Sequence, residues 1–313
     1  MSKTPNEKRI IWRQRTATVL GITQGETEAL LRTQRLQSVR VNPLRGGTPL
    51  SELKSISWMK DGYKLSASQL QAIRDSKDVA EGKLFIQNAA SWLPVVALDP
   101  QPGETILDVC AAPGGKASHI AAITDNKALL TVNDNSRPRL AKMRANFERL
   151  GVGPVETTLF DATQLARKLE GRQFDKILLD APCSGEGMMQ FDRDKDYASW
   201  SVAHIKRLQQ LQKRLITQAW QLLRPGGTLI YSTCTMAPEE NEAVVDYLLR
   251  TREDARLVPF SIDLPNKVPP VLSWNSKQYA TVLQGCLRLQ PSPQVEAFFI
   301  CKITKKDVPS YAE

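Results

Sequence analysis

From about residue 105 to the end, the chain alternates between short apolar runs and amphipathic stretches, and this alternation constrains the fold more than any other feature. The runs have the length and apolar character of buried strands, whereas the stretches between them repeat apolar residues at helical spacing. An alternating order of strands and helices is typical of a mainly parallel sheet that helices cover on both faces. We therefore predict a Rossmann-like α/β fold for this part of the chain.

The expected elements can be placed on the sequence. Strands are expected at residues 105–110, 128–133, 155–160, 176–179 and 228–232, and a late antiparallel pair at 281–287 and 297–301 is expected to complete the sheet. Helices are expected at residues 85–98, 117–123, 137–150 and 205–222, and one more opens at Pro238. Pro238 and the two glutamates after it suit the first turn of a helix, where the helix dipole favours carboxylates.

The first part of the chain follows a different pattern. It combines a basic helix at 26–36, an alternating strand at 38–42 and a Pro/Gly turn at 43–47. These segments predict a small α+β appendage beside the α/β domain. The expected boundaries are 1–80 for the appendage, 81–305 for the α/β domain and 306–313 for a tail.

Composition limits the partners that such a chain would bind. The 42 Lys and Arg residues outnumber the 33 Asp and Glu residues, so the formal net charge is +9. This excess favours a polyanionic partner, nucleic acid above all, although a solvated basic surface without a partner is the plain alternative. No stretch reaches the roughly 18 apolar residues that span a bilayer, and the polar start lacks the apolar core of a signal peptide. We expect a cytoplasmic monomer with no membrane contact.

The cysteines do not suggest a metal site or a disulfide framework. Five cysteines and two histidines are present, and the cysteines form no C-x-x-C pair. Reduced thiols without a metal are therefore expected. Cys110, Cys286 and Cys301 lie within or near predicted strands, and we interpret them as small buried apolar side chains.

A glycine-rich turn joins the first predicted strand to its helix. It reads Asp108-Val109-Cys110-Ala111-Ala112-Pro113-Gly114-Gly115-Lys116. Small residues let the backbone approach a ligand closely, and the N–H groups at the helix start can bind carboxylate or phosphate oxygens. The turn matches neither the phosphate-binding pattern G-x-x-x-x-G-K-[ST] nor the dinucleotide pattern G-x-G-x-x-G. A tight turn without a ligand is an equal alternative on glycine content alone.

Two aspartates stand where the next strands end. Asp134 could accept hydrogen bonds from both ribose hydroxyls of a nucleoside, and Asp161 could bind an adenine amino group. Either aspartate alone is more typical of a helix cap or a turn. Their shared position at the carboxyl ends of strands makes a nucleoside site credible.

Two cysteines follow the fourth and fifth strands. Cys183 lies in Asp180-Ala181-Pro182-Cys183-Ser184-Gly185, and Cys234 lies in Tyr231-Ser232-Thr233-Cys234-Thr235. Both should reach the same edge of the sheet, near the glycine-rich turn. A thiolate that adds to carbon 6 of a cytosine makes carbon 5 able to attack an electrophilic methyl group. A lone cysteine is more often a small buried apolar residue, but two at this edge favour catalysis.

These segments resemble the RsmB/NOP/Sun family of RNA cytosine-5 methyltransferases over roughly residues 84–302. The motifs that carry the resemblance are IQNAASWLPVVALDPQPGETILDVCAAPGGK, NDNSRPRLAKMRANFERLG, DAPCSGEG, LRPGGTLIYSTCTMAPEENE and EAFFICK. The stretches EGMMQFDRDKD and PGGTLIYSTCTMAPEENEA are most similar to the RsmF-like branch that acts on 16S rRNA, while tRNA-modifying relatives share nearly the same core. The segment Ser38-Val39-Arg40-Val41-Asn42-Pro43 resembles the small RNA-contacting module of the family.

The resemblance implies a class I methyltransferase fold that uses S-adenosyl-L-methionine, with an antiparallel final strand. It implies that Cys234 is the nucleophile, that Cys183 promotes release of the methylated base, that Asp180 binds the pyrimidine edge and that Lys116 orients the site electrostatically. The residues implied in cofactor binding are Cys110, Ala111, Ala112, Pro113, Gly114, Gly115, Lys116, Asp134, Asp161 and Asp180. RNA is the implied partner, as rRNA or alternatively as tRNA.

Two other functional classes explain this sequence less completely. A small-molecule or DNA methyltransferase would explain the turn but would leave Cys234 without a role, and an inactive binding module would need a broken site. The family branch with the closest motifs usually carries a further C-terminal RNA-binding domain, whereas this sequence stops shortly after Lys305. Phe191, Tyr197 and Trp200 could stack on bases, with core packing or an exposed lid as equal alternatives.

Overall fold

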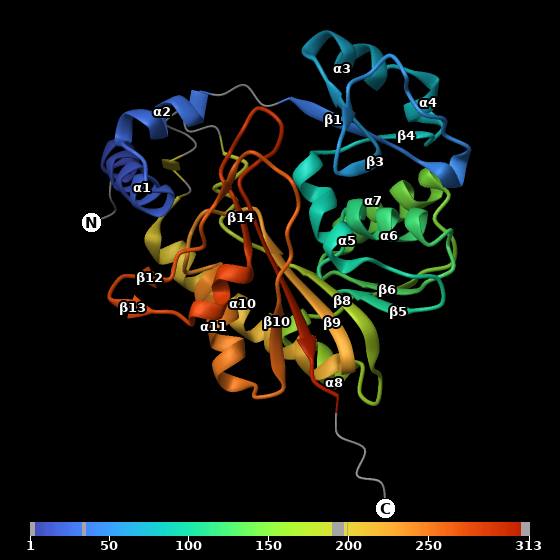
Figure 1. Cartoon of the computed structure of the whole chain (residues 1–313). Helices are drawn as coiled ribbons and strands as arrows, with labels where there is room; N and C mark the ends of the chain where they lie inside the picture. Colours follow the sequence, from blue (N-terminus) through green and yellow to red (C-terminus); the bar gives the residue numbers. More distant parts are fainter. Residues whose placement is uncertain (1–3, 33–35, 190–196, 199, 308–313) are drawn as a thin grey trace, which may run out of the picture.

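A nine-stranded mixed sheet forms the centre of the larger part of the molecule in the computed structural model (Figure 1). The structure describes residues 4–32, 36–189, 197–198 and 200–307. The main order of the strands is β11-β14-β15-β9-β8-β5-β6-β7, and β10 pairs with β15. Their bounds are β5 Thr105–Asp108, β6 Leu129–Asn133, β7 Glu156–Thr158, β8 Phe174–Asp180, β9 Leu223–Thr233, β10 Ala255–Val258, β11 Lys267–Val268, β14 Leu287–Leu289 and β15 Phe298–Lys305.

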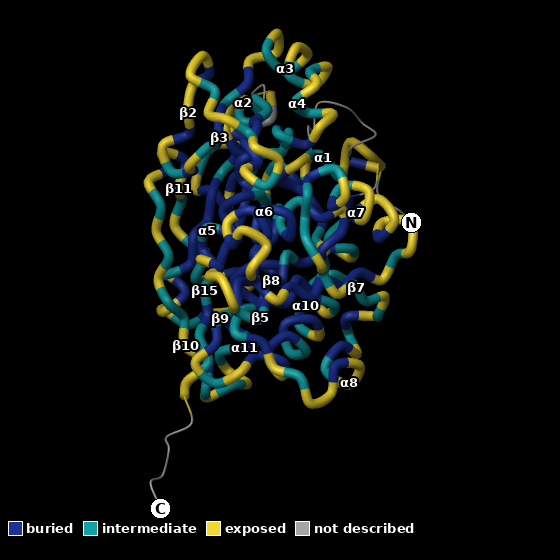
Figure 2. The backbone as a smooth tube through the Cα atoms, turned by 90° about the vertical axis from the view of Figure 1, so that its right-hand side faces the viewer, coloured by how far each residue is buried: buried dark blue, intermediate teal, exposed yellow. Residues whose placement is uncertain are grey.

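The inner strands from β7 to β9 run parallel, and the strands beyond β9 run antiparallel. The central residues of β5, β8 and β9 are buried on both faces, as expected where helices cover a parallel sheet from both sides. Figure 2 shows the same strands as a continuous buried centre. The Rossmann-like fold and the antiparallel final strand are therefore confirmed.

Helices cover the two faces of this sheet and bury separate apolar clusters against it. One face carries α8 Leu165–Lys168, α10 Val202–Leu222 and α11 Glu242–Thr251, and the other carries α5 Leu93–Leu98, α6 Gly115–Ile123 and α7 Arg137–Leu150. Short 3-10 helices lie at η2 Ala89–Trp92, η3 Ala162–Gln164 and η4 Thr281–Gly285, and β12 Ser273–Trp274 pairs with β13 Lys277–Gln278 in a hairpin.

A second, four-stranded sheet has its own apolar cluster. Its order is β2-β3-β1-β4 and all of its pairs are antiparallel. Asn42 ties this sheet to the larger part, because its side-chain amide donates to the carbonyls of Gly82 and Leu150, at 2.8 Å each. The elements are β1 Gln37–Val41, η1 Pro43–Arg45, β2 Ser55–Ile56, β3 Met59–Leu65, α3 Ala67–Arg74, α4 Lys77–Ala80 and β4 Leu84–Ile86.

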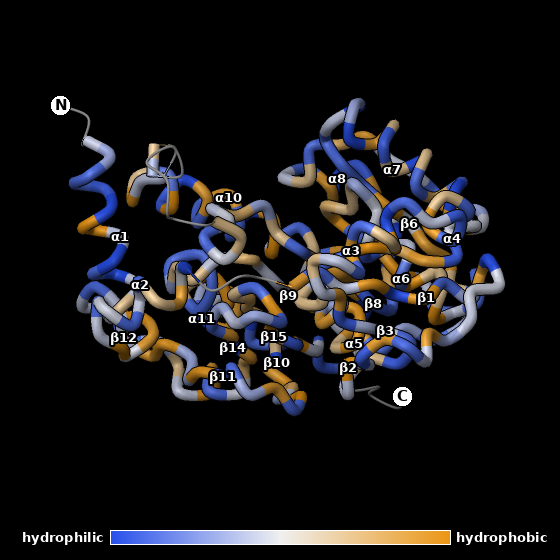
Figure 3. The backbone as a smooth tube through the Cα atoms, turned by 90° about the horizontal axis from the view of Figure 1, so that it is seen from above, coloured by the Kyte–Doolittle hydropathy of each residue, from blue (hydrophilic) through white to orange (hydrophobic). Residues whose placement is uncertain are grey.

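The first two helices, α1 Pro5–Leu20 and α2 Gln24–Arg32, pack on the larger part of the molecule and not on the small sheet. Trp12 of α1 is fully buried in the cluster on the α10 face, and Arg15 forms an ion pair with Glu239. Figures 1 and 3 show α1 at one edge of the molecule, well away from β1 and β3. The domain boundary near residue 80 stays a prediction, and β4 lies beyond it while completing the small sheet.

Several element predictions were wrong in detail. Residues 281–287 were expected to form a strand, but most of them form η4, because a strand here would have to pair with a sheet edge that β10 and β14 already occupy. Residues 85–98 begin as β4 and become helical only at η2 and α5. The helix expected at Pro238 begins at Glu242, and α1 was not predicted at all because its apolar residues are few and scattered.

Candidate active site

The loops after β8 and β9 bring two cysteines into contact. The two strands are parallel neighbours with Asp180 opposite Ser232, so the segments that follow leave the sheet at the same edge. The Sγ atoms of Cys183 and Cys234 lie 3.3 Å apart, and both residues are half-buried free thiols. The hydrogen bond to Cys234, followed by burial, raises the pKa of the Cys183 thiol well above its usual value. The structure therefore brings together the two thiols that the sequence placed at one edge.

An ion pair lies beside these thiols. The Lys116 Nζ is 2.6 Å from Oδ2 of Asp180, and the Ser232 hydroxyl donates to Oδ1 of the same carboxylate at 2.7 Å. Burial lowers the pKa of Lys116, but the nearby Asp180 carboxylate outweighs burial and the net shift is upward. Lys116 is therefore held as a cation, and Asp180 is fixed by two partners with its carboxylate still partly exposed.

The glycine-rich turn connects β5 to α6 and approaches α7 closely. Gly114 has a φ of 95°, and a Cβ at this position would lie 2.7 Å from the Cγ of Met143 and 2.8 Å from a ring carbon of Phe147. Only glycine fits that conformation and that space. The Asn146 side-chain amide donates to the carbonyl of Pro113 at 2.9 Å, so the turn is also held from the α7 side.

Asp108 was not singled out from the sequence, although it ends β5 in the same way that Asp134 and Asp180 follow their strands. Its side chain is buried, and neither carboxylate oxygen has a hydrogen-bond partner among the described residues. Burial raises its pKa to about 7, and the charge of Lys116 offsets part of that rise. A buried carboxyl without a partner is costly unless something else supplies a donor or a positive charge.

Asp134 and Asp161 differ in their surroundings. The Oδ1 of Asp134 accepts from the backbone N–H of Ser136 at 3.0 Å, and its Oδ2 lies 3.1 Å from Arg139. Asp161 is exposed and caps η3, because its Oδ1 accepts from the N–H and the hydroxyl of Thr163, which lower its pKa. In this structure Asp161 is therefore a helix cap, the more typical of the two roles considered for it.

Burial, followed by the charge of Asp108, raises the pKa of Cys110 far above its ordinary value. Cys286 and Cys301 are buried, and burial also raises the pKa of Cys286. None of these three thiols lies in the Cys183–Cys234 pair. The interpretation as small buried residues is consistent with the structure for Cys286 and Cys301, whereas Cys110 is half-buried.

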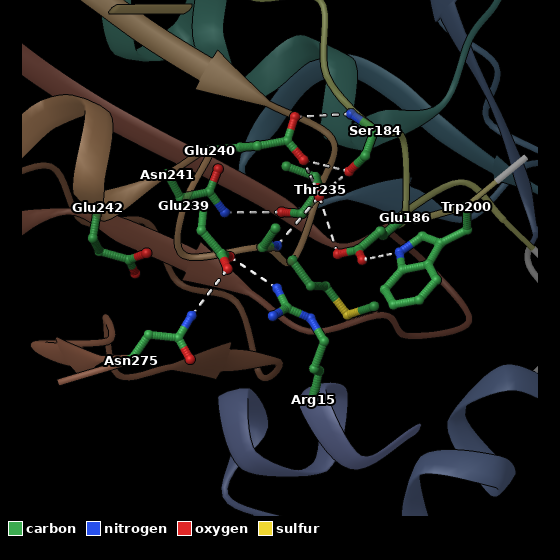
Figure 4. Close-up of polar contacts among 12 residues, drawn as sticks. Arg15, Ser184, Glu186, Trp200, Thr235, Glu239, Glu240, Asn241, Glu242 and Asn275 are labelled. Carbon is green, nitrogen blue, oxygen red and sulfur yellow. Dashed lines mark hydrogen bonds and ion pairs between the residues drawn. The ribbon is translucent and has the colours of Figure 1, made fainter. Parts of the chain in front are cut away.

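A buried carboxyl group joins the two cysteine loops. Glu240 accepts from the backbone N–H of Ser184 at 2.9 Å and from its hydroxyl at 2.5 Å (Figure 4). It also accepts from the side-chain amide of Gln212 at 2.9 Å. Ser184 follows Cys183, and its hydroxyl is also 2.7 Å from that of Thr235, which follows Cys234. Burial raises the pKa of Glu240 to about 7. The sequence assigned this glutamate to a helix start, and nothing in the local pattern showed that it turns back toward the cysteines.

Further contacts brace the loop that carries Cys234. Asn241 accepts from the hydroxyl of Thr233 at 2.5 Å and donates to the carbonyl of Thr235 at 3.0 Å, so it holds the residues on both sides of Cys234. The backbone N–H of Gly187 donates to the carbonyl of Cys234 at 2.9 Å, and a Cβ on Gly187 would lie 2.3 Å from a backbone oxygen. The position of Cys234 is thus fixed from three directions.

The expected base-stacking residues lie elsewhere. Tyr197 is fully buried against Trp12, and Trp200 is 2% exposed with its indole N–H donated to Glu186 at 2.7 Å. Of the alternatives that the sequence left open, core packing therefore describes both rings. Phe191 lies outside the described residues.

Neither a membrane span nor a metal cluster is found in the described part of the chain. Among the residues of known placement, no helix is both long and apolar enough to cross a bilayer. Within the same residues, no group of three or more His, Cys, Asp or Glu side chains is arranged to hold a metal ion.

Comparison with known proteins identifies the relatives of this chain. The profile of the family described as "16S rRNA methyltransferase RsmB/F" matches residues 95–304. A tRNA (cytosine(49)-C(5))-methyltransferase from Pyrococcus abyssi is 37% identical over 86% of this chain and 88% of its own length. Ribosomal RNA small subunit methyltransferase F from Aeromonas salmonicida is 34% identical over 91% of this chain, and the enzyme of that name from a Shewanella species is 34% identical over 80%.

The chain spans only 50% to 60% of the length of those two ribosomal RNA methyltransferases. Among solved structures, a methyltransferase homologue from Pyrococcus horikoshii superposes with a TM-score of 0.74 at 30% identity, over 94% of this chain and 98% of its own. NSun6 from the same organism has the same fold, with a TM-score of 0.76 at 23% identity over 95% of this chain and 98% of its own.

Proposed function

This chain belongs to the RsmB/F family of methyltransferases, and we propose that it transfers a methyl group from S-adenosyl-L-methionine to carbon 5 of a cytosine in rRNA. The observation that carries the proposal is the contact between Cys183 and Cys234 beside the Asp180–Lys116 ion pair. Two thiols in contact next to a carboxylate suit covalent catalysis on a pyrimidine better than they suit a small-molecule transferase, which needs neither thiol.

In the proposed reaction the thiolate of Cys234 bonds to carbon 6 of the cytosine, and the electron pair of the 5,6 double bond makes carbon 5 nucleophilic. Carbon 5 bonds to the methyl group as the bond between that methyl and the donor's sulfonium sulfur breaks, with the electron pair staying on the sulfur as a neutral thioether. A base then removes the proton left on carbon 5, and the Cys234 sulfur leaves carbon 6 with its electron pair. Cys183 promotes this elimination, since its sulfur lies 3.3 Å from the leaving sulfur. Asp180, held by Lys116 and Ser232, binds the N3/N4 edge of the base.

The residues near the glycine-rich turn fit a cationic cofactor. S-adenosyl-L-methionine supplies an electrophilic methyl group when bound, and it carries positive charge on its sulfonium and ammonium groups. The buried, unpartnered carboxyl of Asp108 offers a place for such a charge. We assign the methionine part to the turn from Cys110 to Lys116, the ribose to Asp134 and the adenine to the region of Asp161. Asp180 borders both this site and the proposed base site.

A tRNA substrate is the second candidate, because the tRNA methyltransferase from Pyrococcus abyssi matches this chain over 88% of its own length, whereas the rRNA enzymes extend well beyond the match. The target cytosine must leave any stacked helix to expose carbon 6, so a loop, a bulge or a flipped nucleotide is expected in either RNA. We further propose that residues 81–305 form the catalytic domain, that residues 1–80 contact RNA and that the protein acts as a cytoplasmic monomer.

Methyl transfer from labelled S-adenosyl-L-methionine into separate rRNA and tRNA pools tests the proposal. The native protein should form 5-methylcytosine in one of the pools. Cys234→Ala should abolish incorporation, and Cys183→Ala should leave a covalent protein–RNA adduct that survives denaturing electrophoresis. Cys286→Ala is the matched control, because it removes a thiol outside the pair and should retain activity. Cofactor binding without incorporation into RNA would overturn the proposed substrate.

A further inference from the structure

A cleft on the surface of α10 combines positive charge with a buried donor that has no hydrogen-bond partner in the described part of the chain. Its volume is about 1100 Å³, and it lies between α10, Arg15 of α1 and the β12–β13 hairpin. Its described lining includes five basic side chains and a single carboxylate, Glu239. The basic residues are Arg15, Lys206, Arg207, Arg214 and Lys277.

Among the described residues, most of this positive charge is not neutralised by a carboxylate. Glu239 is 7% exposed, and Arg15, 2.9 Å away, already pairs with it, as Figure 4 shows. Lys206, Arg207 and Lys277 are exposed and form no ion pair with any carboxylate among the described residues. Burial and, after it, the charge of Lys277 lower the pKa of neighbouring Lys213. Such a cluster attracts an anion with several charges.

The wall of this cleft also contains Trp274, a buried tryptophan with an unpartnered N–H among the described residues. The residue is 9% exposed, lines the cleft, and its indole N–H has no hydrogen-bond partner among the described residues. The Arg15 guanidinium stacks over the ring, 5.1 Å from its centroid, so the ring face is covered. A buried N–H donor normally finds an acceptor. With the face covered, Trp274 offers a hydrogen bond and no surface for base stacking.

The cleft is linked to the catalytic loops through one stretch of chain. Glu239 in its wall precedes Glu240, which holds the N–H of Ser184 next to Cys183. Glu239 also accepts a hydrogen bond from Asn275 of the hairpin, at 3.4 Å. An RNA strand bound in the cleft would therefore lie beside Glu239, the neighbour of Glu240 in the hydrogen-bond network that positions both thiols.

We infer that this cleft binds the sugar-phosphate backbone of the RNA strand that flanks the target cytosine. The unpaired cations match phosphates, and the Trp274 N–H matches a phosphate or ribose oxygen. The covered aromatic face argues against recognition of bases by stacking, so contact here is independent of sequence. The inference rests on the proposed RNA substrate and adds a second RNA-binding surface, on the opposite side of the molecule from the small sheet in Figure 1.

The test compares two double variants with the same change in net charge. Lys206→Gln/Arg207→Gln removes two cations of the cleft, and Arg167→Gln/Lys168→Gln removes an adjacent exposed pair on α8 that does not line the cleft. Affinity for in vitro transcribed 16S rRNA and for bulk tRNA is measured by filter binding across a salt series. Loss of two phosphate contacts should weaken binding about tenfold and reduce the slope of log K against log salt by about 1.4.

The cleft variant should raise the KM for RNA while kcat and the Kd for S-adenosyl-L-methionine stay within about twofold. Trp274→Phe keeps the ring and removes the N–H, so it should weaken binding by a few fold with an unchanged salt slope. Equal affinities and slopes for the cleft and α8 variants would overturn the inference while leaving methylation by the native protein intact. Unchanged affinity for naked RNA with lost binding to assembled ribosomal subunits would assign the cleft to a protein partner and would also overturn it.

Discussion

Replacing Glu240 by glutamine should change how the stability of the protein depends on pH. The folded protein holds the pKa of Glu240 at about 7, above the ordinary 4.5, because the carboxyl is buried. The folded state therefore keeps a proton that the unfolded chain releases between pH 4.5 and 7. The contribution of this group to the free energy of unfolding is largest below pH 4.5 and declines as the pH rises through 7.

The size of this decline follows from the shift of the pKa. Each pKa unit corresponds to about 1.4 kcal/mol, so the whole contribution is about 3 kcal/mol. A glutamine at this position resembles the protonated acid. Its carbonyl can accept from the N–H of Ser184 and from Gln212, while the hydroxyls of Ser184 and Thr235 rotate to accept from its amide. Glu240→Gln should therefore fold, and its stability should lack this decline.

Urea unfolding followed by circular dichroism from pH 5 to 8.5 measures the effect. The free energy of unfolding of Glu240→Gln minus that of the native protein should increase by about 2 to 3 kcal/mol as the pH rises from 5 to 8.5. Asp161→Asn is a suitable control, because hydrogen bonds from Thr163 lower its pKa below this range and its difference curve should be flat. A flat curve for Glu240→Gln as well would refute the assignment of a raised pKa to this carboxyl.

Three other changes give separate tests. Asp108→Asn should weaken the binding of S-adenosyl-L-methionine at pH 8 by roughly tenfold or more, because ionisation of Asp108 near pH 7 creates the negative charge that a cationic ligand needs. The native protein should gain affinity between pH 6 and pH 8, and the variant should not. Equal affinities of the two proteins in calorimetry at pH 8 would contradict this. Burial lowers the pKa of His119 well below 6.5, so stability should fall below pH 6.5 by up to about 1.4 kcal/mol per pH unit, and His119→Phe should melt with a shallower acid dependence. Arg288→Met leaves the buried Glu242 carboxylate without its partner at 2.5 Å and should cost about 3 to 5 kcal/mol in urea unfolding, much of it recovered by adding Glu242→Gln; no recovery would mean that the loss is one of packing.

Local sequence patterns were sufficient for the elements whose periodicity is strong. The helix predicted at 137–150 is α7 Arg137–Leu150, with a proline near its start and Gly151 closing its end in the left-handed conformation. The order of parallel strands followed from apolar runs between helical stretches. From that order alone, Cys183 and Cys234 were expected at one edge of the sheet, and the structure places their sulfurs in contact.

Patterns failed where a distant part of the chain decides the conformation. Residues 84–86 form a strand because β1 offers them an edge, although the sequence around them suggested a helix. The α1 helix has little amphipathic character of its own, and its position depends on Trp12 entering a core built mostly by residues 190 or more positions later. Propensity and periodicity are local quantities, so they do not report such contacts.

The alternation of strands and helices and the residue types at the candidate site could be read from the linear order of the residues. The folded arrangement was needed to show that Asp108 is buried without a hydrogen-bond partner among the described residues and that Glu240 turns back to hold Ser184 and Gln212. It was also needed to show that Arg15 meets Glu239 across 224 positions of sequence. Burial and long-range hydrogen bonds depend on how separate elements close over one another. A sequence specifies that closure only through all of its contacts together.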